Sequence, residues 1–196
     1  MGQYIMRLKD ILSGEKDKMG KISFPDRAIL FCGILYNKNF DLKKVEEILA
    51  RYFGKIIFSS SKFEFTETDY YNEEMGEPIF RIFYAIDKLI EQDKIIELKL
   101  LSNKLEDEYF TINSKRKVNI DPGYVTKAKV VLPTTKNFQH RIYMGKGIFA
   151  EVTLRWRKGS FTEWEWTFKD YRRKESIEFF NKLREYYSNL KSSGKI

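Results

Sequence analysis

The stretch HRIYMGKGIFAEVTL, which begins at His140, gathers residue types that can carry acid–base and phosphate chemistry. His140 is the only histidine of the 196-residue chain, and histidine gains and loses a proton near neutral pH, as a general acid or base must. Arg141 beside it is suited to clamp a phosphate through two hydrogen bonds. Glu151 could act as a base or ligate a metal ion. The alternative is structural: His140 is a hydrogen-bonded residue before a strand, and Glu151 pairs with Arg155 or Arg157 on its own strand face.

Two lysines and two glycines add to the anion-binding character of this stretch. Lys136 and Lys146 supply positive charge on either side of His140. Gly145 and Gly147 let backbone N–H groups approach an anion closely. An ordinary flexible basic turn has the same composition, so both interpretations stay open.

The composition excludes several standard kinds of site. The one cysteine, Cys32, lies in the apolar run AILFCGILY and leaves no internal disulfide and no cysteine-based zinc site. A single histidine excludes the zinc motifs that need two. The sequence also lacks the Gly-x-x-x-x-Gly-Lys-Ser/Thr loop with which P-loop proteins hold phosphates. Phosphate chemistry in this chain must therefore rely on other residues.

Charge is distributed unevenly along the chain. The net charge is +8, which favours anionic partners such as nucleotide phosphates or nucleic acid. Residues 64–77 include six acidic residues and no base, whereas residues 115–158 include eleven Lys or Arg and two acidic residues. The two segments could be solvated surfaces that attract each other. They could also be the two walls of a cleft for a phosphate-bearing ligand, with room for a divalent metal.

Aromatic and polar residues in predicted loops add further candidates. Tyr70 and Tyr71 stand next to each other in the acidic segment and could stack on a base or a sugar. Asp121 before Pro-Gly is ordinary turn chemistry, which leaves Asn119 and Tyr124 on either side of that turn without an explanation. The motif WTFKDYRR near the C-terminus again combines aromatic residues with an acid and arginines.

These observations define three groups of candidate residues. The catalytic candidates are His140, Glu74 and Glu151. The candidate ligands of a divalent metal such as magnesium are Asp121, Glu74 and Glu151. The candidates for binding a substrate are Tyr70, Tyr71, Asn119, Tyr124, Lys136, Arg141, Tyr143, Lys146, Asp170 and Arg172.

Hydrophobic periodicity predicts the elements that position these residues. The clearest is a helix between Asp41, as N-cap, and Gly54, as the stop. A turn at Pro122-Gly123 is expected to separate two strands. The expected strands cover residues 28–36, 55–68, 77–86, 116–121, 125–132, 147–157 and 160–168, and two further helices cover 93–109 and 173–191.

This order of elements predicts an α+β fold. It matches a ferredoxin-like βαββαβ core with additional antiparallel strands and a C-terminal helix, and the alternative is another α+β sheet with its helices on one face. Residues 1–24 are expected to be an N-terminal leader and residues 25–192 a single α+β domain. No apolar run is long enough to span a membrane and the N-terminus has no signal-peptide core, so the cytoplasm is the expected location.

Several blocks in a fixed order resemble a known family. They are TDYYNEEMGEP, LSNKLEDEY, RKVNIDPGY, TTKNFQHRIYMGKGIFAEVTL and WTFKDYR. Together they resemble domain of unknown function 4416, an uncharacterised prokaryotic family, over roughly residues 25–190. The resemblance implies no particular activity, so the roles of the residues must be argued from their chemistry.

The sequence leads to two hypotheses about function and one geometric test. The first is an enzyme that acts on a phosphate-containing small molecule or nucleotide, with His140 as general acid or base and Arg141 as phosphate clamp. The alternative is an RNA-binding or ribosome-associated module that uses the basic 115–158 region; an interaction protein without catalysis is a third option. The enzyme hypothesis requires that segments 66–76, 119–124, 136–151 and 167–172 form one site in which His140, Arg141 and at least two carboxylates converge. It fails if the side chains of His140, Glu74 and Asp121 lie on separate faces.

Overall fold

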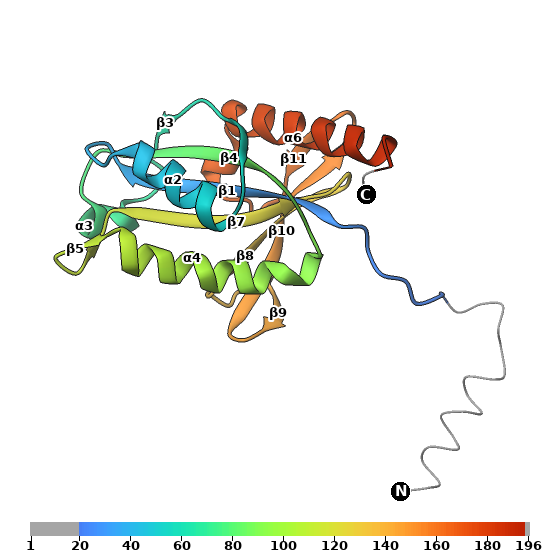
Figure 1. The fold of residues 1–196 in the computed structure, drawn as a ribbon, viewed down its shortest axis with the longest axis horizontal. Coiled ribbons are helices and arrows are strands. Elements are labelled where there is room, and N and C mark those ends of the chain that lie inside the picture. Colours follow the sequence, from blue (N-terminus) through green and yellow to red (C-terminus); the bar gives the residue numbers. More distant parts are fainter. Residues whose placement is uncertain (1–19, 195–196) are drawn as a thin grey trace, which may run out of the picture.

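The computed structural model describes residues 20–194, so most of the predicted leader lies outside the described residues. Within that part of the chain the fold is α+β, with a nine-stranded antiparallel sheet and helices on both of its faces (Figure 1). The strands are β1 (Ala28–Asn37), β2 (Ile56–Ser59), β3 (Phe63–Glu64), β4 (Ile79–Ile90), β7 (Val118–Val125), β8 (Lys129–Thr134), β9 (Ile142–Gly145), β10 (Ile148–Arg157) and β11 (Ser160–Glu163). The helices are α2 (Leu42–Tyr52), α3 (Asn72–Met75), α4 (Ile95–Tyr109), α5 (Lys169–Arg172) and α6 (Lys174–Ser192), with short 3-10 helices η1 (Asp69–Tyr71) and η2 (Gln92–Lys94).

The sheet is ordered β11–β10–β8–β7–β1–β4–β2, with β3 on β4 and β9 on β10. A separate two-stranded ladder joins β5 (Thr111–Ile112) and β6 (Lys115–Arg116). The central strand β1 pairs with β4 on one side and β7 on the other, and nine of its ten residues are buried. This explains its unbroken apolar sequence, because a strand covered on both faces needs no polar alternation.

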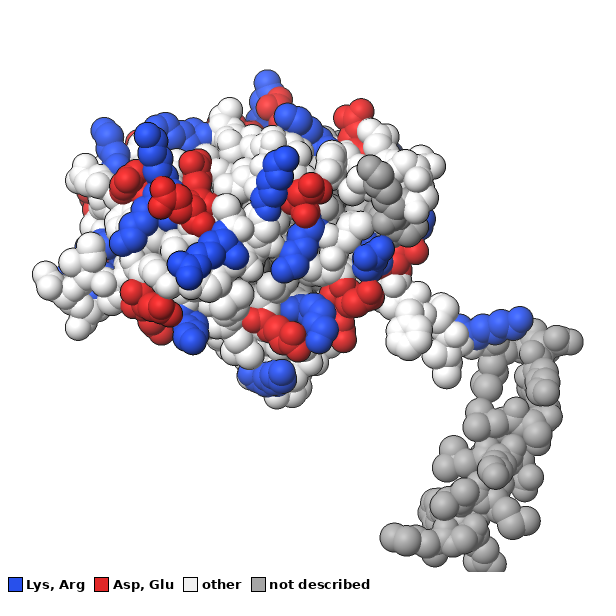
Figure 2. Space-filling view, in the orientation of Figure 1, with Lys and Arg blue, Asp and Glu red and all other residues white. Residues whose placement is uncertain are grey.

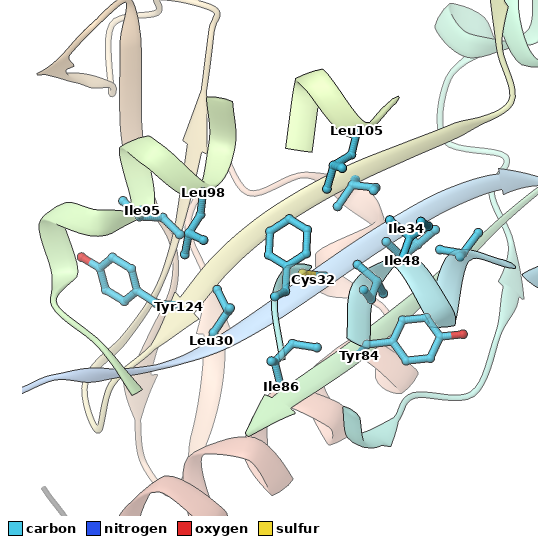
Figure 3. Close-up of a cluster of buried hydrophobic side chains, with 14 of the residues drawn as sticks. Leu30, Cys32, Ile34, Ile48, Tyr84, Ile86, Ile95, Leu98, Leu105 and Tyr124 are labelled. Atoms are coloured by element: carbon cyan, nitrogen blue, oxygen red, sulfur yellow. The ribbon is translucent and has the colours of Figure 1, made fainter. Parts of the chain in front are cut away.

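The two larger hydrophobic cores lie on opposite faces of the sheet, and a third, smaller cluster contains Leu35, Phe65, Met75 and Ile79. One lies under α2 and α4, where Leu30 and Cys32 of β1 meet Ile48 of α2 and Leu98 of α4 (Figure 3). The other lies under α6, whose Phe180 packs on the opposite face of the same strands. In Figure 1 the central strands run between α4 and α6. Among the described residues, none of the helices combines the length and the apolar character that crossing a bilayer requires.

The helix α2 forms as its local sequence predicts. The Asp41 side chain accepts a hydrogen bond from the backbone N–H of Lys43 at 3.0 Å, which satisfies one of the free donors at the helix N-terminus. Val45 and Leu49 are buried on one face. Gly54 follows the helix with a positive φ of 129°, a conformation that glycine adopts without strain.

The predicted turn at Pro122-Gly123 is wrong. The strand β7 runs through both residues, and Pro122 and Gly123 pair with Cys32 and Phe31 of β1. Gly123 is required by close packing, because a Cβ there would lie 2.3 Å from Cζ of Phe31. The chain turns after β7, where the backbone N–H of Thr126 donates to the carbonyl of Lys129.

The strand β10 departs from simple alternation. Its register against β8 shifts between Val152 and Leu154, so Val152 packs against the core under α4 and Leu154 belongs to the core under α6. Glu151 and Thr153, which alternation assigns to a mixed polar face, are both buried. The predicted hairpin into β11 is confirmed, and its two turn residues have the positive φ values that a two-residue hairpin turn of type I′ requires.

Candidate functional site

The sheet opens between β7 and β8, and this opening creates the site. The two strands pair only at Tyr124–Val131 and Val125–Val130, after which β8 follows β10 and leaves β7 without a partner on that side. The backbone of Ile120 is satisfied by α4 instead: its N–H donates to Oε1 of Glu106 at 2.8 Å, and its carbonyl accepts from Nζ of Lys99 at 3.4 Å. The backbone N–H positions of residues 120 and 122 point to the same edge of the strand. That edge has no partner strand here, so the missing N–H of Pro122 breaks no hydrogen bond between strands.

A pocket of about 600 Å³ occupies the opening between β7 and β8. We call it the β7–β8 pocket. Its walls come from β4, β6, β7, β8, β10, η1, α4, α5 and the loops that precede η1, β9 and α5. Its lining residues are Phe65, Thr68, Tyr70, Tyr71, Arg81, Lys99, Asn103, Glu106, Asp107, Arg116, Asn119, Asp121, Leu132, Pro133, Thr134, Thr135, Lys136, Arg141, Glu151, Phe168, Asp170 and Tyr171.

Buried charges form a chain of ion pairs at the floor of the pocket. Asp121 accepts from Nζ of Lys99 at 3.2 Å and from Nδ2 of Asn119 at 2.7 Å, and Nη1 of Arg81 lies 3.5 Å from it. Nη2 and Nε of Arg81 also reach Oδ2 of Asp170, at 2.7 and 2.8 Å. Burial raises the pKa of Asp121, but Lys99 and Arg81 outweigh it and leave the pKa below its usual value. Asp121 is therefore a charged acceptor that faces the pocket.

Glu106 is the buried acid of this floor with a pKa near neutrality. Burial raises its pKa to about 7, against the opposing effect of Lys99, Arg116 and the Ile120 N–H. Its carboxylate pairs with Arg116, which also donates to Asn119 at 3.1 Å. A carboxyl group of this pKa is present in both protonation states at neutral pH, which is the property that a general acid or base needs.

His140 does not line the pocket, but it contacts Glu151, which does. Its Nε2 lies 3.1 Å from Oε2 of Glu151, and the same oxygen accepts from Nε of Arg141 at 2.9 Å. The imidazole stacks on Trp166 at 5.2 Å with an interplanar angle of 11°. The Glu151 side chain is 1% exposed, so the pair with Arg141 is a buried one. His140 and Glu151 thereby fix the position of Arg141, which lines the pocket.

Cations and aromatic rings meet at the mouth of the pocket. Nζ of Lys136 lies 4.0 Å from the ring centroid of Tyr70, and the Arg141 guanidinium lies 5.8 Å from that of Phe168. Tyr70 and Phe168 are 63% and 47% exposed, although both rings are large and apolar. From the acidic segment Phe65, Thr68, Tyr70 and Tyr71 line the pocket, but none of its acidic residues does. Arg141 meets two of the predicted carboxylates, Asp121 and Glu151, in the pocket lining, whereas His140 and Glu74 are not part of that lining.

Comparison with known proteins gives one result. The model of the family "Domain of unknown function (DUF4416)" matches residues 26–187. The chain belongs to this family. The matched range includes every residue that lines the β7–β8 pocket, so the pocket lies within the DUF4416 domain of this chain. No curated protein and no solved structure matches the chain.

The DUF4416 domain brings many of the predicted site residues together. The predicted residues that line the β7–β8 pocket are Tyr70, Tyr71, Asn119, Asp121, Lys136, Arg141, Glu151 and Asp170. They come from all four of the predicted segments.

The other predicted residues lie outside the pocket lining. Tyr124 is buried in β7 and donates to Gln92 at 3.1 Å. Arg172 donates to backbone carbonyls between residues 164 and 167, so it holds the loop before α5. Tyr143 and Lys146 are exposed on the β9–β10 hairpin.

Glu74 and the other two predicted metal ligands do not form one site. Glu74 pairs with Arg116 at 3.1 and 3.0 Å, and each of Asp121 and Glu151 has cations of its own. Within residues 20–194, no group of three or more His, Cys, Asp or Glu residues is arranged to hold a metal ion. Each carboxylate is held by the cations next to it, so the three are kept apart.

Sequence analysis missed the contribution of α4 and β4 to the site. Lys99, Asn103 and Glu106 recur at helical spacing, which is typical of a solvated helix face and gives no local sign of a site. Arg81 is the one charged residue in the apolar run IFRIFYAI. A charge in the middle of a strand with buried neighbours on both sides is the signal that could have identified it.

Proposed function

We propose that this protein is an enzyme that acts on a phosphate-containing small molecule, including nucleotides, in the β7–β8 pocket. A volume of about 600 Å³ suits a ligand of this size. The ligand would place its phosphate at the mouth, where Lys136 and Arg141 carry positive charge, and its reacting part near the floor. We also infer a ferredoxin-like core, which is supported by the antiparallel order β7–β1–β4–β2 and by α2 and α4 on one face of those strands.

The observation that carries the proposal is Glu106 at the floor of a pocket with cations at its mouth. Glu106 rather than His140 is the proposed general acid or base, because its pKa is about 7 and it lines the pocket. Arg141 keeps its proposed role as phosphate clamp. Its Nε and Nη1 are occupied by Glu151 and by the carbonyl of Lys136, which leaves Nη2 for a ligand.

The RNA-binding alternative has weaker support. Nucleic-acid surfaces gather Lys and Arg on one face with few acidic residues between them. On the face seen in Figure 2, which α2 and α4 cover, basic and acidic side chains are interspersed. Arg116 in the basic segment is also engaged by Glu74 and Glu106.

A thermal-shift screen of the full chain tests the proposal. The ligands are inorganic phosphate, pyrophosphate, nucleoside monophosphates and sugar phosphates. The proposal predicts that at least one raises the melting temperature, and that Lys136→Ala reduces this shift. Lys146→Ala is the matched control, because it removes the same charge from the exposed β9–β10 hairpin. The proposal is overturned if none of the compounds shifts the melting temperature, or if both variants reduce the shift equally.

A further inference from the structure

We propose that the floor of the β7–β8 pocket is a subsite for ligand hydroxyl groups, so that the compound it takes is a phosphorylated sugar or polyol. This inference rests on the proposed function and deepens it, because it names the class of substrate. The subsite is formed by Tyr171, Asn103, Lys99 and Asp121, which all line the pocket.

The Tyr171 hydroxyl is the first reason for this assignment. The residue is 1% exposed, and its hydroxyl has no hydrogen-bond partner among the described residues. Burial raises its pKa well above the usual value, so the group stays a neutral hydroxyl that can both donate and accept. It lies within electrostatic range of Arg81, Asp121 and Asp170, which line the floor. A buried hydroxyl without a partner is costly unless a ligand or water supplies one.

Neighbouring floor groups also have hydrogen-bonding capacity left. The side-chain amide of Asn103 makes no hydrogen bond to the described residues and offers two donors and an acceptor. Lys99 uses two of its three protons, on Ile120 and on Asp121. Asp121 accepts from Lys99, Asn119 and Arg81, which leaves about one of its roughly four lone-pair positions.

This mixture of free donors and acceptors fits hydroxyl groups better than it fits a phosphate. A hydroxyl gives one hydrogen bond and accepts others, so several hydroxyls can satisfy amide, ammonium, carboxylate and phenol together. A phosphate dianion has acceptors only and would face the carboxylates of Asp121, Asp170 and Glu106. The cations beside these carboxylates, Arg81, Lys99 and Arg116, are already paired with them. The phosphate therefore belongs at the mouth with Lys136 and Arg141, and the hydroxyls belong at the floor.

Paired ligands separate this inference from the proposed function. The probes are methyl phosphate, which has no hydroxyl beyond its phosphate, and glycerol 3-phosphate, ribose 5-phosphate and glucose 6-phosphate, measured by calorimetry on the full chain. We expect at least one polyol phosphate to bind about tenfold tighter than methyl phosphate, because a site built to hydrogen-bond hydroxyls discriminates strongly against their loss. If methyl phosphate binds as tightly as all three, the hydroxyl subsite is overturned while the proposed function stands. If no phosphate compound binds, both fail.

Tyr171→Phe tests the residue that carries the argument. The hydroxyl it removes has no partner in the protein, so we expect the melting temperature of the free protein to stay the same or rise. The preference for the polyol phosphate should fall about tenfold, with methyl phosphate affinity unchanged. Equal losses for both ligands would overturn the inference.

A second variant keeps the test valid if Tyr171→Phe does not fold. Asn103→Ala should also lower the preference for the polyol phosphate. Asn189→Ala is its matched control, because that asparagine is exposed on α6. If Asn103→Ala and the control variant prefer the polyol phosphate over methyl phosphate to the same degree, the subsite is contradicted.

Discussion

At the scale of single residues, the burial of Glu106 makes stability depend on pH. Its pKa is about 7 in the folded protein and near 4.5 in an ordinary glutamate, so between these values the folded state binds more protons than the unfolded state. The free energy of unfolding should therefore fall as pH rises from about 4.5 to about 7, by up to about 3 kcal/mol. Urea unfolding at pH 5 and pH 8 measures this difference. Glu106→Gln should reduce it, whereas Glu108→Gln, exposed on the same helix, should not.

The buried pair of Glu151 and Arg141 gives a second prediction at this scale. The Arg141 side chain is 9% exposed, so Glu151→Gln leaves a buried guanidinium without its carboxylate. We expect a loss of about 3–5 kcal/mol in the free energy of unfolding. The exposed pair of Lys94 and Glu97 is the control, and Glu97→Gln should cost no more than about 1 kcal/mol. Equal effects of the two variants in urea unfolding would contradict this account.

At the scale of elements, the contact between β7 and β1 depends on Gly123. Gly123→Ala places a Cβ against the Phe31 ring, which itself packs edge-on against Phe180. We expect a loss of about 1–3 kcal/mol or more, measured by urea unfolding. Phe31→Leu should relieve the clash with the ring, although not the one with the backbone carbonyl oxygen of Val131, which would lie 2.8 Å from the same Cβ. The double variant should therefore lose less stability than the two single variants together. If the losses of the two single variants simply add up in the double variant, the clash with the ring does not determine the loss of stability.

The helices and strands also show which parts of the fold and the site can be predicted from the sequence. The helix α2 was predicted because its cap, its apolar face and its stop all lie within its own residues. Pro122-Gly123 has the local signature of a turn, but its conformation is set by pairing with β1, which is distant in sequence. The four predicted segments do line the pocket, whereas Glu106 was missed because its burial depends on where β8 leaves β7. Long-range pairing is invisible to local patterns.

At the scale of the whole molecule, the two cores share their central strand. Side chains of β1 alternate between them: Leu30 packs under α4 and Phe31 packs under α6. Neither core can be lost while β1 stays in place, so the described residues should unfold in one transition. Leu49→Ala in one core and Phe180→Ala in the other should each cost about 2–5 kcal/mol and shift that single transition. Two separate transitions in calorimetry would contradict this prediction.

The opening between β7 and β8 gives the molecule an internal reporter. The Ile120 amide donates to the Glu106 carboxyl group rather than to a neighbouring strand. Its nitrogen and proton chemical shifts in a two-dimensional NMR spectrum should therefore follow the protonation of Glu106, with a midpoint near pH 7. A compound that enters the pocket and changes that protonation would move the same signal. One backbone resonance can thus report on the floor of the pocket without any added label at the site.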